Sequence, residues 1–220
     1  MDSEYLYIIG IITILIILFS IFYYYYWSPA KTNVNKYKIT LLNDETIFDE
    51  SYTNTIPMLT QVTDRDTLYI PKLGYGLSFV WDMYIPSLGG NDKWQTSFNR
   101  IKPIISMADS PVISYHPKKN YLSIVLKYRN NPFYAQFAEI KFDTIKPQKW
   151  SKYILIIENR NIKLYINNIL SATKILPSIP VIYDIQSEVV LGDINNNFQG
   201  KVKNMALYPY PLSLDEIELV

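Results

Sequence analysis

Carboxylates are the first residues to test for chemistry, because two of them at a fixed separation form a simple hydrolytic site. Retaining glycosidases need such a pair roughly 5–5.5 Å apart. Asp215, Glu216 and Glu218 gather near the end of the sequence. However, Ser213 and Glu216 have capping-box spacing ahead of Ile217, which predicts a short helix. We therefore interpret the three carboxylates as a solvated capping turn.

Histidine chemistry has one candidate, since His116 is the only histidine in the chain. It stands beside Pro117 and Lys118, a setting typical of a turn residue, and no Ser-His-Asp arrangement is evident around it. The sequence has no cysteine, no zinc-ligand spacing and no glycine-rich phosphate loop. We expect a protein that is not an enzyme and that needs no cofactor.

Aromatic rings are the remaining candidates, because an exposed ring offers a flat apolar face for a sugar. Tyr75, Trp94 and Tyr134 lie in loop-like sequence and are the candidate ligand-stacking residues. The chain has 20 tyrosines, so some exposed rings are expected by chance and the signal is weak.

The segments that must position these residues have a hydrophobic period of two, which predicts strands. Residues 77–85 and 121–128 alternate most clearly. Residues 153–158 and 162–166 flank a short polar turn and predict a hairpin. The other predicted strands are residues 37–42, 103–106, 112–116, 138–142, 188–191 and 201–208. Many strands without intervening helices predict an all-β antiparallel sandwich or barrel.

The N-terminal part reads differently, because residues 5–27 contain no charged side chain. The apolar residues 6–22 would form a helix of about 25 Å, which is shorter than a hydrocarbon core of roughly 30 Å. Adding Tyr23, Tyr24, Tyr25, Tyr26 and Trp27 closes the gap and forms a membrane-interface belt. A buried soluble helix and a cleaved signal peptide are the alternatives. We favour a retained transmembrane helix, because the segment before it is acidic and bulky rings follow it.

The charges that flank this segment predict its orientation. Lys31, Lys36 and Lys38 follow it, and no Lys or Arg precedes it. The positive-inside rule then places the C-terminal domain on the cytosolic side of the membrane. The lack of cysteine and of Asn-x-Ser/Thr sequons agrees with that side.

Composition limits the partners. A net charge of +1 gives no electrostatic footprint for nucleic acid. Heavy use of Ile (32), Lys (17) and Asn (17) follows A/T-rich codons and suggests an AT-rich genome, such as that of a protist, some bacteria or a large DNA virus.

An ordered set of motifs resembles the laminin-G-like domains of the concanavalin A-like lectin/glucanase superfamily. The motifs are Leu77-Ser78-Phe79-Val80-Trp81, Trp150-Ser151-Lys152-Tyr153, Asn161 to Asn168, Val189 to Asp193, Phe198-Gln199-Gly200-Lys201-Val202 and Pro211 to Ile217. The resemblance covers residues 37–220 and is most specific over 150–217. It implies a concanavalin A-like jelly roll in which Trp81, Trp150, Tyr165 and Phe198 are mainly core residues.

The same resemblance implies two activities to check. Superfamily hydrolases carry an E-x-D-x-E or E-x-D-x-x-E pattern, which is absent here. Some laminin-G-like domains bind calcium through a loop aspartate, so Asp193 beside Asn195 to Asn197 is a weak metal candidate. Calcium sites usually collect more carboxylates than this.

Together these features predict three parts: a transmembrane anchor (1–27), a linker (28–36) and a laminin-G-like β-sandwich (37–220). The first hypothesis is a non-enzymatic structural protein that contacts the lipid bilayer through residues 5–27 and binds a protein partner. The suggested source makes that partner a capsid protein, so that this would be a minor capsid protein linking an internal virion membrane to the shell. The alternative is a lectin-like carbohydrate-binding module displayed on a membrane. A glucanase-type enzyme ranks last.

Overall fold

The computed structural model describes residues 13, 15–19, 38–49, 51–57, 76–86, 100–108, 110–131, 134–143, 145–181, 188–194, 196 and 199–220. The chain divides into two compact units, Met1–Val34 and Asn35–Val220. In the first unit, Thr13 and residues 15–19 are helical. The predicted interface belt (23–27), the linker (28–36) and Phe198 lie outside the described residues. Among the described residues, no helix is long and apolar enough to cross a bilayer.

The second unit is built from two antiparallel sheets. Sheet A has the strand order β1-β13-β4-β9-β10-β11, with β2 pairing to β13. Its strands are β1 (Ile39–Leu42), β2 (Thr46–Ile47), β4 (Leu77–Tyr84), β9 (Ser151–Glu158), β10 (Asn161–Ile166), β11 (Ile169–Ile175) and β13 (Lys201–Tyr208).

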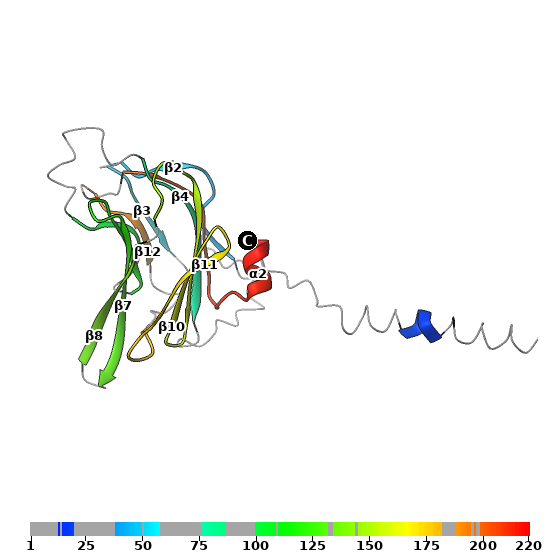
Figure 1. Cartoon of the computed structure of the whole chain (residues 1–220). Helices are drawn as coiled ribbons and strands as arrows, with labels where there is room; N and C mark the ends of the chain where they lie inside the picture. Colours follow the sequence, from blue (N-terminus) through cyan, green and yellow to red (C-terminus); the bar gives the residue numbers. More distant parts are fainter. Residues whose placement is uncertain are drawn as a thin grey trace, which may run out of the picture. The chain divides into compact units, whose positions relative to one another are not determined.

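Sheet B has the order β3-β12-β5-β6-β7-β8. Its strands are β3 (Thr53–Pro57), β5 (Lys102–Met107), β6 (Val112–His116), β7 (Tyr121–Asn131), β8 (Tyr134–Phe142) and β12 (Glu188–Gly192). Figure 1 shows the two sheets as facing layers, with β7, β8 and β12 in one and β4, β10 and β11 in the other. The predicted all-β antiparallel sandwich is confirmed.

The main core lies between the sheets and follows from the period-two pattern. On β4, Phe79, Trp81 and Met83 point inward and are at most 1% exposed. They face sheet B side chains such as Ile113 and Ile124, which are fully buried. Each such side chain contributes about 1.5–3 kcal/mol through burial. Trp81 also stacks on Tyr153, with ring centroids 5.5 Å apart.

Tight turns join β9, β10 and β11 into a meander. Asn159 has φ 52° in the β9–β10 turn, and Asn167 and Asn168 have φ 51° and 64° in the β10–β11 turn. Asn tolerates the left-handed region better than other non-glycine residues. The predicted hairpin is therefore confirmed.

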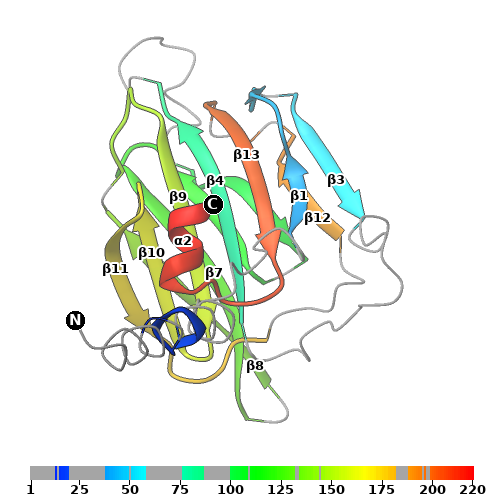
Figure 2. The same cartoon turned by 90° about the vertical axis from the view of Figure 1, so that its right-hand side faces the viewer.

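A second apolar layer lies on the outer face of sheet A. Val80, Ile154 and Ile156 point away from the main core, yet each is at most 6% exposed. The C-terminal helix α2 (Leu214–Leu219) covers this face, and Figure 2 shows it in front of β4 and β9. Ile217 of α2 is 2% exposed.

The polypeptide before α2 is fixed by Ser78, which is fully buried. Its hydroxyl donates to the Tyr210 carbonyl (3.0 Å) and accepts from the Leu212 N–H (2.9 Å). The predicted capping box of α2 is present, with Ser213 as N-cap and Glu216 as its partner.

Three sequence interpretations are wrong. Trp150 is half-buried on the outer face of sheet A and is not a core residue. His116 ends β6 and is only 6% exposed, so it is not a turn residue. Glu216 is not solvated, because at 8% exposure it accepts hydrogen bonds from Tyr210 and Ser213.

Candidate functional site

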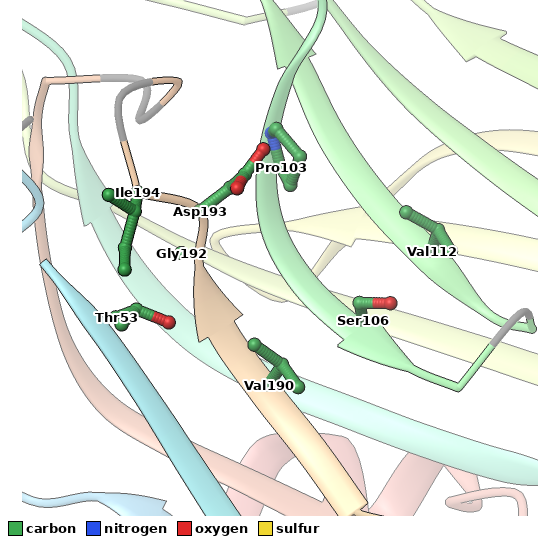
Figure 3. A pocket seen from close by; sticks show the side chains of 8 residues that line it. All are labelled: Thr53, Pro103, Ser106, Val112, Val190, Gly192, Asp193 and Ile194. Carbon is green, nitrogen blue, oxygen red and sulfur yellow. The ribbon is translucent and has the colours of Figure 1, made fainter.

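A shallow groove of about 380 Å³ crosses the outer face of sheet B. Its lining combines apolar side chains with two hydroxyls and one carboxylate. The lining residues are Thr53, Pro103, Ser106, Val112, Val190, Gly192, Asp193 and Ile194. Figure 3 shows Asp193 beside Pro103 at one end, with Val190 and Ser106 toward the other.

Sheet register explains why these residues meet. Val190 on β12 is opposite Ser106 on β5, and Ser106 is opposite Val112 on β6. Cross-strand partners present their side chains on the same face of a sheet. All three are half-buried on the outer face, because their strand neighbours fill the core. They form the floor of the groove.

The carboxylate end of the groove is set by the turn after β12. Gly192 has φ 74°, which favours glycine, and the chain turns there so that Asp193 leaves the sheet. The Asn196 N–H donates to the Asp193 carbonyl (3.0 Å). The Asn196 side chain accepts from Lys102 Nζ (3.1 Å) and donates to the Ile101 carbonyl (3.2 Å). These bonds tie the turn to the start of β5.

The polar groups of the groove suit hydroxyl-bearing ligands. A carboxylate can accept hydrogen bonds from two or more hydroxyls, and serine and threonine hydroxyls can both donate and accept. Ser106 Oγ donates to the Ala108 carbonyl (2.8 Å). The lone pairs of the Ser106 oxygen can still accept a hydrogen bond from a ligand. Val190 and Val112 supply an apolar surface beneath. Among the described residues, one carboxylate lines the groove, whereas glycosidic hydrolysis uses two.

A polar cluster lies on the same face of sheet B as the groove. It consists of His116, Tyr121, Ser123, Glu139 and Lys141. Ser123 Oγ donates to Glu139 Oε1 (2.8 Å), and Lys141 Nζ lies 3.1 Å from Glu139 Oε2. Lys141 also lies over the Tyr121 ring at 5.2 Å, and the His116 and Tyr121 rings are 4.9 Å apart.

These contacts set the charges of the polar cluster. Burial, followed by the nearby Lys119 ammonium, lowers the pKa of His116 below its ordinary value. Its Nδ1 accepts from the Lys119 N–H (3.3 Å), which places any ring proton of the neutral form on Nε2. Burial alone would raise the pKa of Glu139, but the Ser123 hydroxyl and Lys141 outweigh it and hold that pKa low. At pH 7 the cluster therefore holds a neutral imidazole beside an ion pair.

Comparison with known proteins identifies the fold. No protein-family model matches the sequence, and no curated protein matches it. Among solved structures, the binding domain of botulinum neurotoxin serotype D matches with TM-score 0.57 and 16% identity, over 84% of this chain and 46% of that one. The serotype G binding domain matches with TM-score 0.55 and 15% identity, over 84% and 46%. This chain shares its fold with part of the neurotoxin binding domains.

A third match is the serotype D ligand binding domain in complex with N-acetylneuraminic acid. Its TM-score is 0.55 and its identity 15%, over 82% of this chain and 43% of that chain. This chain thus spans less than half the length of the solved structures it matches. Identities this low show the fold alone.

The structure places some of the predicted site residues and leaves others outside the described part of the chain. Asp193 lies in the groove, and among the described residues no three His, Cys, Asp or Glu side chains gather to hold a metal ion. Tyr134 begins β8 and is therefore not in a loop. Tyr75 and Trp94 fall outside the described residues.

Sequence reasoning missed the hydroxyls of the groove. Ser106 and Thr53 carry no motif, and β3 was not predicted at all. A usable signal was present on the neighbouring strand, where Val112, Ser114 and His116 alternate with the core residues Ile113 and Tyr115. An outer face with polar residues at alternate positions is where a sheet meets solvent or a ligand.

Proposed function

We propose that this protein is a non-catalytic binding protein whose β-sandwich recognises carbohydrate in the groove of sheet B. The observation that carries this proposal is the lining of the groove: one carboxylate and two hydroxyls stand over an apolar floor in an open recess of about 380 Å³. That volume is at the small end of ligand pockets, which suits a short oligosaccharide end better than a large cofactor.

The proposed binding mode assigns a role to each side of the groove. Asp193 accepts hydrogen bonds from two neighbouring sugar hydroxyls, because charged acceptors make the stronger bonds. Thr53 and Ser106 bond to further hydroxyls. The C–H face of the sugar ring packs on Val190 and Val112. Removing that apolar face from water adds affinity without adding specificity.

The comparisons support this proposal at the level of the fold. One protein with the same fold was solved with N-acetylneuraminic acid, so sandwiches of this type occur in carbohydrate-binding proteins. The match covers less than half of that chain, so the proposed place of the sugar rests on the groove alone.

We also propose that residues 5–27 anchor the protein in a membrane with the sandwich on the cytosolic side. The support is the uncharged stretch and the three lysines that follow it. In sealed vesicles, protease on the cytosolic face should digest the sandwich, and full protection would contradict this topology. The capsid partner and the virion location stay predictions.

The carbohydrate proposal is tested with the full-length chain in detergent on a glycan array. We expect specific binding to a small set of glycans. Asp193→Asn keeps the size of the side chain but removes its charge, and should weaken binding about tenfold or more, because hydrogen bonds to charged groups are worth about 1.5–3 kcal/mol.

Asp215→Asn is the matched control, since Asp215 is also an exposed aspartate but lies on α2, against the other sheet. It should leave binding unchanged. Absence of any specific glycan binding, or equal loss in both variants, would overturn the proposal.

A further inference from the structure

The outer face of sheet A carries an ordered set of six half-buried residues next to α2, which we call the lysine–aromatic surface. Lys152 on β9, Asp82 on β4 and Lys203 on β13 are cross-strand partners and form one row. Two residues along the strands, Tyr84 is the partner of Lys201 and contacts Trp150, which forms a second row. The surface consists of Asp82, Tyr84, Trp150, Lys152, Lys201 and Lys203.

The aromatic pair Tyr84 and Trp150 already contacts a lysine of the same surface. The Tyr84 and Trp150 rings lie 5.8 Å apart at 45°. The Lys203 ammonium sits 4.5 Å from the centre of the Trp150 ring, in a cation–π contact. A sugar needs an open ring face for stacking, so this pair does not fit a pyranose. It fits a partner that meets Lys203 with a negative charge.

Two of the three lysines of the surface already have polar partners within the chain. Lys201 pairs with Glu45 (2.6 Å), and Lys152 donates to the Val220 carbonyl oxygen. The one carboxylate within the rows, Asp82, accepts from the Asn204 amide (2.7 Å). Among the described residues, Lys203 takes part in no ion pair. A carboxylate brought to this position by a partner would therefore gain an ion pair that the described residues do not supply.

We propose that the lysine–aromatic surface binds an extended acidic segment of a protein partner. Lys201 and Lys203 are two residues apart on one strand, which separates them by about 7 Å, and Lys152 lies two strand spacings, about 10 Å, from β13. An extended peptide with acidic residues at alternate positions presents its carboxylates about 7 Å apart on one side. This spacing matches β13.

Aromatic residues ringed by polar side chains are also typical of protein interfaces, where Trp and Tyr are enriched. The surface lies on the sheet opposite the groove, and this inference does not depend on carbohydrate binding there. A bilayer is a poorer fit, because none of the six residues is an aliphatic side chain that could insert among lipids.

The test uses the full-length chain in detergent and two fluorescent nonapeptides of equal composition. In one, glutamate alternates with serine and threonine; in the other, the glutamates are contiguous. We expect the alternating peptide to bind more tightly, with an affinity that falls as salt rises. Lys203→Gln should weaken it about fivefold, the upper range for an exposed ion pair. Asp82→Asn should strengthen it, because it removes a repelling carboxylate.

Lys163→Gln is the matched control for this surface. Lys163 is also a partly exposed lysine of sheet A, and unlike Lys203 it has a glutamate partner, Glu158 (2.8 Å). It should leave peptide binding unchanged. Equal losses in Lys203→Gln and Lys163→Gln would mean non-specific attraction, and would overturn the proposal. Equal binding of the two peptides, or binding of dextran sulfate alone, would also overturn it.

Discussion

Protonation of His116 should make the stability of the sandwich depend on pH. It is the only histidine in the chain, so it is the one side chain with an ordinary pKa near 6.5. In the folded protein its pKa is lowered, first by burial and then by Lys119. The unfolded chain therefore binds this proton more readily than the folded chain, and stability falls as the pH is lowered.

We expect the melting temperature of the protein to fall between pH 7.5 and pH 5.5. The contribution of His116 is complete above its unfolded pKa and is lost as the pH drops through the lower, folded value. His116→Gln should flatten this part of the curve, because glutamine does not titrate. Parallel curves for the two proteins, measured by scanning calorimetry, would show that His116 is not the source.

Single residues also show how far the sequence was informative. Trp81 and the hairpin of residues 153–158 and 162–166 were predicted correctly, because hydrophobic alternation and a short polar turn are local properties. Trp150 and Glu216 were misassigned. Their burial depends on β4, β13 and the tail before α2, which are distant in sequence, and alternation does not tell which outer face is later covered.

Among the elements, α2 has the clearest structural role. Its capping box was predicted from Ser213 and Glu216. The structure adds the position of the helix on the outer face of sheet A. It lies over β4 and β9 on that face, which carries the buried side chains of Val80, Ile154 and Ile156. An uncovered apolar face of this kind would be an association site.

Removal of the α2 anchor should therefore destabilise the protein. Ile217→Ala is expected to lower the free energy of unfolding by about 2–4 kcal/mol, because the side chain is 2% exposed. Leu219→Ala is the control on the same helix, since Leu219 is 65% exposed, and its effect should stay within about 0.5 kcal/mol. Denaturant melts that give the two variants equal stability would show that α2 does not seal this face.

The strands that were missed share a physical cause. β3 reads TNTIP and its first three residues are exposed, while β11 reads ILSATKI and most of it is exposed. Both are edge strands. An edge strand buries little, so it carries no clear alternation between apolar and polar residues. The groove was missed for the same reason, since Thr53 and its hydroxyl come from β3.

At the scale of the whole molecule, the two outer faces of the sandwich differ in chemistry. Sheet B presents the groove, with one carboxylate, two hydroxyls and an apolar floor. Sheet A presents α2 and the lysine–aromatic surface. The two faces point away from each other, so a carbohydrate and an acidic protein segment could be bound at the same time. This arrangement would suit a protein that links two partners.

The central claim is that the groove of sheet B binds carbohydrate, and a crossed titration tests it most directly. The best glycan from the array is titrated by calorimetry into the full-length protein, Asp193→Asn and Lys203→Gln. The groove predicts that Asp193→Asn alone weakens binding, by about tenfold or more, while Lys203→Gln matches the unaltered protein. Unchanged affinity in Asp193→Asn, or a loss confined to Lys203→Gln, would contradict the claim.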